Sequence, residues 1–201
     1  MPSVYDLKPK FQNLLRPASD FLAAKGVSAN NVTTAAMLLS VAVGVLLFTG
    51  ATRLFWLVPL TMLVRMALNA IDGMLAREHA MKSNLGAILN ELSDVVSDIA
   101  LYLPFAFIAD FPQLLTIVVI FLAVISEMAG VIAVQIGADR RYDGPMGKSD
   151  RAVVFSVLAM LVACDVKWST LYFIVIAAVA ILLCVTIKNR CANALKNTEG
   201  A

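Results

Sequence analysis

Apolar residues fill six long stretches of this chain, and short polar segments separate them. The stretches lie at residues 32–52, 54–74, 85–109, 113–136, 152–166 and 169–187, and the fifth is the shortest. Because a helix needs about 20 apolar residues to cross a bilayer, each stretch predicts one membrane-spanning helix. We therefore expect an all-α integral membrane protein of about six transmembrane helices, give or take one, in a single membrane domain over residues 1–201.

The segment before the first stretch, residues 1–31, has a different pattern. Its apolar residues recur at spacings of three and four, with basic residues among them: Leu7, Phe11, Leu14, Leu15, Ala18, Phe21 and Leu22, with Lys8, Lys10 and Arg16. This pattern predicts an amphipathic helix that lies on the membrane surface and bends or restarts at Pro17. An ordinary polar lead-in to the first span is the alternative. No cleaved signal is expected, because the segment lacks a short apolar core near its start.

Composition excludes a soluble domain, since 60% of the residues are hydrophobic and only 15% are charged. The three cysteines form no CxxC pair, and the chain has one histidine, so neither a disulfide framework nor a Cys/His zinc site is expected. With six spans, both termini and all but three of the 16 basic residues fall on one side of the membrane. The positive-inside rule makes that side cytoplasmic, and we expect a bacterial inner-membrane location.

Polar side chains interrupt the second and third stretches at helical spacing. The second stretch carries Arg65, Asn69 and Asp72, and the third carries Gly86, Asn90, Asp94 and Asp98, with Glu91 at a poorer angle. Since a short loop joins the two stretches, their polar faces should meet near the cytoplasmic end. Carboxylates without nearby histidine or cysteine favour a hard cation such as Mg²⁺, Mn²⁺ or Ca²⁺. The alternative is a structural network in which the acids pair with Arg65 and Arg77.

At these residues the chain resembles the CDP-alcohol phosphatidyltransferases. The family motif is D-x-x-D-G-x-x-A-R, eight residues, and G-x-x-x-D-x-x-x-D; the matching residues here are Asn69, Asp72, Gly73, Ala76, Arg77, Gly86, Asn90 and Asp94. Two further segments are similar to family segments that open the first and fifth spans: Ser28, Ala29, Asn30, Val32 and Thr33, and Gly147, Lys148 and Arg151. The chain departs from the motif in having asparagine at its first and third aspartates.

The resemblance implies six transmembrane helices around a cytoplasm-facing site. There, an alcohol attacks a CDP-alcohol such as CDP-diacylglycerol, and CMP leaves. It implies that Asp72, Asp94, Asn69 and Asn90 hold Mg²⁺ or Mn²⁺, with Asp98 as a weaker ligand, and that Asp94 is the catalytic ligand or general base. It implies nucleotide binding by Asn30, Gly73, Ala76, Arg77 and Gly86. The basic residues Arg140, Arg141, Lys148 and Arg151 are candidates for the phosphate of an acceptor, although the positive-inside bias and anionic lipid explain them equally well.

Other readings stay open. The two asparagines are also compatible with a family member that has lost catalysis and binds nucleotide lipid or a partner. A small carrier lined by Arg65, Asp94, Asp98 and Glu127 is a weaker alternative. Glu127 is expected to pair with Arg65 or to stay protonated, and His79 to be solvated in a loop. The expected partners are a CDP-alcohol, an alcohol or phospho-alcohol acceptor and membrane lipid; homodimer packing around Gly44 and Gly130 is open, and no nucleic-acid partner is expected.

Overall fold

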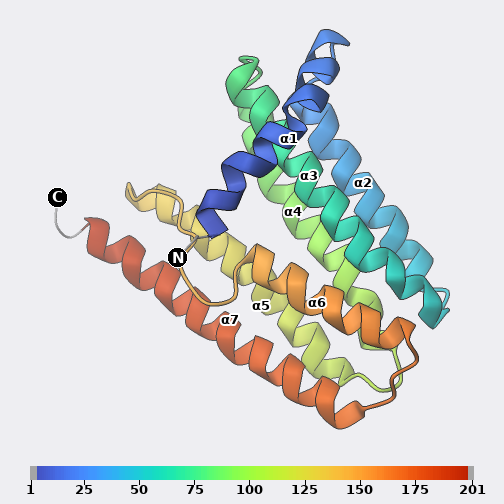
Figure 1. Ribbon diagram of the computed structural model, residues 1–201. Coiled ribbons are helices and arrows are strands. Elements are labelled where there is room, and N and C mark those ends of the chain that lie inside the picture. Colours follow the sequence, from blue (N-terminus) through green and yellow to red (C-terminus); the bar gives the residue numbers. More distant parts are fainter. Residues whose placement is uncertain (1–3, 199–201) are drawn as a thin grey trace. The chain divides into compact units, whose positions relative to one another are not determined.

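The computed structural model describes residues 4–198, with side chains described for residues 11–196. The elements in order are α1 (Val4–Ala24), α2 (Ala29–Leu47), η1 (Thr52–Trp56), α3 (Leu57–Glu78), α4 (Asn84–Tyr102), η2 (Leu103–Phe107), α5 (Gln113–Ile132), η3 (Ala133–Ile136), α6 (Lys148–Ala163) and α7 (Ser169–Thr198) (Figure 1). Over residues 4–198 there is no strand, and the predicted all-α fold is confirmed.

One long helix overlaps each of the six predicted stretches, and most of these helices begin or end a few residues away from the predicted bounds. Four segments are long and apolar enough to cross a membrane: Ala29–Leu47, Thr52–Glu78, Gln113–Ile136 and Ser169–Lys196. Helix α4 carries three acidic residues, and α6 has only 16 residues, so these two lie outside that set. The membrane fold therefore agrees with the sequence, while the count of six spans stays a prediction.

The chain divides into two compact units. Unit 1 consists of the chain up to Ala42 together with Leu60–Ser97, and unit 2 consists of Val43–Pro59 together with the chain from Asp98 onward. Helices α2, α3 and α4 each contribute one end to each unit. The motif residues up to Asp94 therefore belong to unit 1, and the four candidate acceptor cations belong to unit 2.

Helix α1 packs on the rest of unit 1 through one of its faces. Leu15 and Leu22 contact the buried cluster of Ala29, Val32, Ile71 and Leu75, and Arg16 forms an ion pair with Glu78 at 3.1 Å. Leu14 and Phe21 point the other way and are exposed, as an interfacial helix requires. The helix continues through Pro17, so the expected restart there does not occur. The predicted contributions of the Leu7, Lys8 and Lys10 side chains lie outside the described side chains.

Helix caps fix the ends that border the candidate site. Gly26 adopts a left-handed backbone after α1, and the Ser28 hydroxyl then accepts a hydrogen bond from the Asn31 N–H at 3.2 Å to cap α2. Ala80 is left-handed after α3, and Ser83 caps α4 by accepting from the Gly86 N–H at 2.9 Å. Each helix N-terminus near the site is therefore held by a serine directly before it.

Unit 2 has an aromatic core with closely packed helices around it. Tyr102 stacks on Phe155, and Phe105 meets Phe155 edge to face. Helices α5 and α7 pack along one another (Figure 1). A Cβ on Gly44 would collide with the Ala100 carbonyl oxygen, and one on Gly130 would collide with that of Arg141. Both glycines thus serve packing within the chain, and homodimer formation stays a prediction.

Candidate active site

Unit 1 contains a cleft of about 540 Å³ bordered by the first turns of α2 and α4 and the last turns of α3. Its lining residues are Ala29, Asn30, Thr33, Asp72, Gly73, Ala76, Arg77, Met81, Lys82, Ser83, Asn84, Gly86, Ala87, Asn90 and Glu91. All five predicted nucleotide-binding residues are in this set, as are two predicted metal ligands, Asp72 and Asn90. Residues separated in the sequence by more than 50 positions therefore meet around one space.

The two motif glycines let neighbouring polar side chains approach the helix backbones. A Cβ on Gly86 would lie 2.7 Å from the Asn30 Oδ1, and one on Gly73 would lie 3.0 Å from a terminal nitrogen of Arg77. The Asn30 amide in turn donates to the Ser83 hydroxyl at 3.4 Å. The glycines therefore place the Asn30 amide and the Arg77 guanidinium in the cleft wall, where both can reach a bound ligand.

Asp72 is the buried carboxylate of the cleft. It is 7% exposed, and its Oδ2 accepts a hydrogen bond from the Thr33 hydroxyl at 2.8 Å. This bond joins α2 to α3 and fixes the carboxylate orientation. Thr33 was not among the predicted site residues, although it belongs to the segment resembling the family's first-span motif. Lys82 and Glu91 also line the cleft. The position of Lys82 in the short loop between the two polar helices is the feature of the sequence that could have identified it.

Asp94 faces α3 from α4. Its Oδ1 lies 3.4 Å from the Asn69 amide nitrogen, which donates to it, and 3.7 Å from a terminal nitrogen of Arg65. The Arg65 side chain is buried, whereas that of Asp94 is 18% exposed. Arg65 thus neutralises Asp94, and its expected pairing with Glu127 is wrong. The predicted meeting of the two polar helix faces is present at this contact.

The donor atoms around the cleft are chemically suited to a hard divalent cation. Asp72 and Asn90 line the cleft, and Asn69 and Asp94 contact each other beside them on the same two helices. Carboxylate and amide oxygens are the ligands that Mg²⁺ and Mn²⁺ accept. Among the described residues, no three His, Cys, Asp or Glu side chains form a metal-binding group. A cation here would therefore depend on two carboxylates and on the amides at positions 69 and 90.

Asp98 is held differently from the other candidate ligands. It lies in unit 2, is 5% exposed, and its Oδ2 accepts hydrogen bonds from Arg151 at 3.0 and 3.3 Å. Its expected role as a weaker metal ligand stays a prediction. The sequence shows that Asp98 lies one helical turn after Asp94, but it does not show that Arg151 of α6 is its partner.

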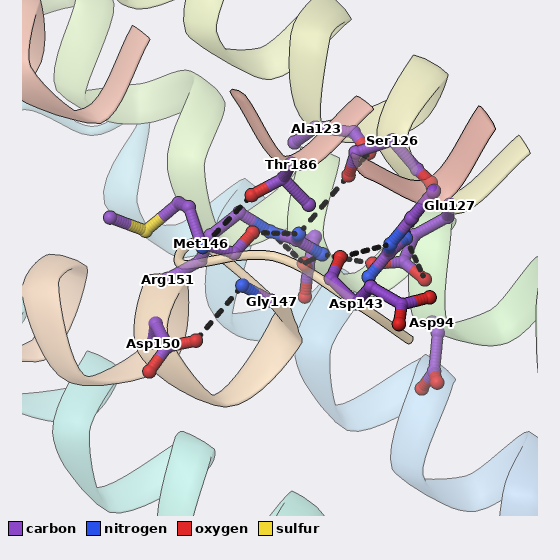
Figure 2. Close-up of polar contacts among 12 residues, drawn as sticks. Asp94, Ala123, Ser126, Glu127, Asp143, Met146, Gly147, Asp150, Arg151 and Thr186 are labelled. Carbon is purple, nitrogen blue, oxygen red and sulfur yellow. Dashed lines mark hydrogen bonds and ion pairs between the residues drawn. The ribbon is translucent and has the colours of Figure 1, made fainter. Parts of the chain in front are cut away.

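Arg151 and Glu127 form the centre of a buried polar network in unit 2 (Figure 2). Arg151 donates to Glu127 at 3.0 Å and also contacts the Ser126 hydroxyl and the Met146 carbonyl oxygen. Arg190 from α7 contacts the other Glu127 oxygen at 3.3 Å and donates to the Ser126 carbonyl oxygen. No pattern in the sequence indicates that Arg190 belongs to this group.

The four predicted acceptor-phosphate cations do not form one open basic surface. Arg151 is 1% exposed and is bonded to two acids. Arg140 lies 3.4 Å from Glu127 and stacks over the Tyr142 ring. Lys148 begins α6. Their role toward an acceptor stays a prediction.

Arg141 pairs with Asp143 in the loop before α6. Two hydrogen bonds of 2.7 and 2.9 Å join the guanidinium to the carboxylate. These bonds, with a smaller contribution from Asn193, hold the pKa of the Asp143 carboxyl below its ordinary value, and partial burial opposes them. The loop is also tied to α7, because the Thr186 hydroxyl accepts from the Met146 N–H at 2.9 Å.

Comparisons with known proteins agree with these features. The sequence matches the profile of the CDP-alcohol phosphatidyltransferases over residues 27–186. Inner membrane protein YnbA of Escherichia coli K12 is 45% identical over 194 residues, covering 96% of each chain. The fold is similar to that of Mycobacterium tuberculosis phosphatidylinositol phosphate synthase PgsA1 with CDP-DAG bound, with a TM-score of 0.76, 18% identity and coverage of 90% of this chain and 94% of that chain.

A second structure of that synthase, in complex with manganese and citrate, gives a TM-score of 0.76 at 19% identity, covering 90% of this chain and 88% of the other. At such low identity the structural similarity establishes the shared fold. The family profile covers most of the sequence, including both halves of the motif and the cleft they line. The chain therefore belongs to the CDP-alcohol phosphatidyltransferase family.

Proposed function

We propose that this protein transfers a phosphatidyl or similar phosphoalcohol group from a CDP-alcohol, such as CDP-diacylglycerol, to an alcohol acceptor in phospholipid synthesis. The observation that carries the proposal is the unit 1 cleft, around which Asn30, Gly73, Ala76, Arg77 and Gly86 gather with Asp72. Similarity to an inner membrane protein of Escherichia coli supports an inner-membrane location. The distribution of basic residues supports a cytoplasmic site and cytoplasmic termini.

The cleft suits a donor with a diphosphate. Arg77 and Lys82 supply positive charge to its wall, and the Asn30 amide supplies a further donor. Arginine pairs well with phosphate oxygens because its planar guanidinium can donate two parallel hydrogen bonds. In a nucleotide-activated lipid the acyl chains stay in the bilayer while the diphosphate lies at the headgroup level, which is where this end of the helices is expected.

The reaction forms one P–O bond and breaks another. The acceptor hydroxyl oxygen attacks the phosphorus next to the alcohol part of the donor, the bond to the CMP oxygen breaks, and CMP leaves with the bonding electron pair. We assign Asp94 as the group that accepts the hydroxyl proton, with Asn69 and Arg65 holding its carboxylate in place. A bound Mg²⁺ or Mn²⁺ held by Asp72 and Asp94, with the Asn69 and Asn90 oxygens, would supply neutralisation of the diphosphate charge.

A specific observation supports a second candidate, a member that binds nucleotide lipid without turning it over. Asn69 and Asn90 contribute no charge to a cation, and Arg65 already neutralises part of the Asp94 charge. Both features lower the affinity of the site for a divalent ion. The carrier alternative is weaker, because Arg65, Asp98 and Glu127 each have oppositely charged partners at 3.0–3.7 Å.

The test is CMP release by the purified protein in detergent or liposomes. CDP-diacylglycerol is supplied with a panel of alcohol acceptors and with Mg²⁺, Mn²⁺ or a chelator, and Asp94→Asn serves as the inactive control. Metal-dependent CMP release with a phospholipid product, lost in the control, would establish the transferase. Folded protein that binds CDP-diacylglycerol but releases no CMP with any acceptor would support the second candidate.

A further inference from the structure

Arg65 is a buried cation in the part of unit 1 that carries the motif. It lies on α3 one helical turn before Asn69 and is 3% exposed. One terminal nitrogen lies 3.7 Å from the Asp94 Oδ1, and the other contacts the Met62 sulfur at 3.6 Å. Burial of a charged side chain within a membrane segment is costly, which makes such a residue a candidate for function. Arg65 therefore places a fixed positive charge beside one of the two motif carboxylates.

Asp94 receives a second donor from the same helix. The Asn69 amide directs its N–H, rather than its oxygen, at the same Oδ1, at 3.4 Å. Where this chain has Asn69, the family motif has an aspartate, which would add negative charge at this point instead. Arg65 and Asn69 thus already provide part of the charge compensation that a divalent cation would give to Asp94.

The charges at the cleft are balanced before any ligand binds. The lining carries two carboxylates and two cationic side chains: Asp72, Glu91, Arg77 and Lys82. The Asp94–Arg65 pair beside it adds one charge of each sign. A diphosphate esterified at both ends carries about one negative charge on each phosphate, as a phosphodiester does. One divalent cation therefore neutralises the bound diphosphate, whereas a second would leave two excess positive charges that repel each other.

Resting on the proposed transferase function, we propose that Arg65 takes the place of a second divalent cation, so that the complex with the CDP-alcohol donor contains one divalent ion per chain. Aspartates at positions 69 and 90 would add two negative charges and would make room for another ion. With asparagines there, the guanidinium supplies the remaining positive charge. Since it is part of α3, it also stays in place when CMP leaves, as preorganised electrostatic groups do.

The first test counts Mn²⁺ in the wild-type protein. Mn²⁺ is titrated into protein in detergent micelles with saturating CDP-diacylglycerol and no acceptor, and free Mn²⁺ is measured by electron paramagnetic resonance. Micelles with CDP-diacylglycerol but no protein give the background. We expect one bound Mn²⁺ per chain with the spectrum of an isolated ion. Two bound ions, which would be coupled at a separation of about 3.5–4 Å, would overturn the proposal, as would the absence of bound Mn²⁺.

The second test restores the charge that the proposal says is missing. Asn69→Asp combined with Asn90→Asp adds two carboxylates on the helices that border the cleft. We expect this variant to bind two Mn²⁺ per chain and to give the spectrum of a coupled pair. A single Mn²⁺ in the folded double variant would contradict the charge argument.

The third test compares Arg65→Gln with Arg65→Lys, which keeps the positive charge. Because the glutamine removes a cation next to Asp94, we expect Mn²⁺ to bind Arg65→Gln at least about fivefold more tightly than Arg65→Lys. Equal affinities, or weaker binding by Arg65→Gln, would show that Arg65 does not replace a cation. Should Arg65→Gln fail to fold, the wild-type count and the double variant still decide.

The Mn²⁺ count does not depend on turnover, so it separates this proposal from the transferase function. One bound Mn²⁺ in a protein that releases no CMP with any acceptor would count against the transferase and would still support the role of Arg65. CMP release by a protein with two bound Mn²⁺ would support the transferase and overturn the role of Arg65.

Discussion

Charged residues in the two units differ in their exposure and in the distance to their partners, as Asp94 and Asp98 of α4 show. Asp94 in unit 1 is 18% exposed at its side chain and contacts Asn69 and Arg65 at 3.4 and 3.7 Å. Asp98 in unit 2 is 7% exposed at its side chain and contacts Arg151 at 3.0 Å. Removing one partner of a buried ion pair destabilises the protein, because the other charge is left uncompensated. A more open acid beside a cleft can exchange its contacts for those of a ligand.

The same difference extends to the surroundings of each acid. The unit 1 cleft gathers groups that can face a ligand, such as Arg77, Lys82 and Asn90. In unit 2, by contrast, the guanidiniums of Arg140, Arg151 and Arg190 contact the Glu127 carboxylate. The ionisable groups of this protein are therefore of two kinds, and the distance to the nearest charged partner distinguishes them. The following substitutions test this comparison, from the largest expected effect to the smallest.

Asp94→Asn should remove activity while leaving the fold intact. The amide keeps the size of the side chain but cannot accept the acceptor proton, so we expect CMP release to fall by about 10²–10⁴-fold. The thermal unfolding midpoint in detergent should fall less than it does for Asp98→Asn, because Arg65 lies 3.7 Å from Asp94 whereas Arg151 lies 3.0 Å from Asp98. Retention of more than a tenth of the wild-type CMP release would contradict the role assigned to Asp94.

Asp98→Asn should have the reverse effect. Loss of this carboxylate leaves the buried Arg151 with less compensation, and we expect the free energy of unfolding to fall by about 3–5 kcal/mol. Reversible unfolding in mixed detergent micelles measures it, with Asp94→Asn as the matched substitution four residues earlier. Unchanged stability together with lost metal dependence would instead make Asp98 a metal ligand.

This pair of acids also shows what the sequence could predict. The long apolar stretches predicted all six long helices of the hydrophobic part, because burial in lipid leaves little choice but helix. The spacing of the motif predicted that Asp72, Gly73, Arg77, Gly86 and Asn90 share one region, because residues four apart lie on one helix face. Prediction of the cleft was possible because its lining comes mainly from two helices that are neighbours in the sequence, α3 and α4, and from the start of α2.

Contacts that depend on packing between distant helices could not be predicted. Nothing in the local sequence of α5 indicates that Glu127 meets Arg190, which comes 63 positions later, or that Gly130 faces the Arg141 carbonyl group. The expected pairing of Glu127 with Arg65 failed for this reason. Charge and hydropathy identify which residues need partners, but the packing of the helices selects the partners.

Asn69→Asp combined with Asn90→Asp should raise the affinity of the unit 1 cleft for a divalent cation. The change restores the two missing acids of the motif, and affinity for hard cations rises with ligand charge. We expect the Mn²⁺ concentration for half-maximal thermal stabilisation to fall by about tenfold, with lower stability than the wild type in chelator because four carboxylates then repel. Equal Mn²⁺ dependence of both proteins would show that these positions do not face a cation.

Gly86→Ala should weaken donor binding with little effect on the chemical step. The added methyl group would lie 2.7 Å from the Asn30 Oδ1, so the amide must move out of its place in the cleft wall. Since such overpacking costs about 1 kcal/mol or more, we expect the KM for CDP-diacylglycerol to rise about fivefold. Asn30→Ala removes the nearest colliding group and leaves only the Ser83 Oγ, at 3.0 Å, so the double variant should lose little more than Asn30→Ala alone. Additive losses would show that Gly86 acts independently of Asn30.

The loop before α6 should give the smallest effect, and only at acidic pH. Hydrogen bonds from Arg141 hold the pKa of Asp143 below its ordinary value, against an opposing effect of burial and with a smaller contribution from Asn193. A carboxyl with a lowered pKa in the folded state stabilises the protein above the unfolded-state pKa of about 3.9 and loses this contribution as the pH falls through the folded value. We therefore expect the difference in unfolding midpoint between the wild type and Asp143→Asn to be constant above about pH 5 and to shrink below it. A difference that grows on acidification would have the wrong sign for a salt-bridged carboxylate, and the Arg141–Asp143 pair would then not stabilise the folded loop.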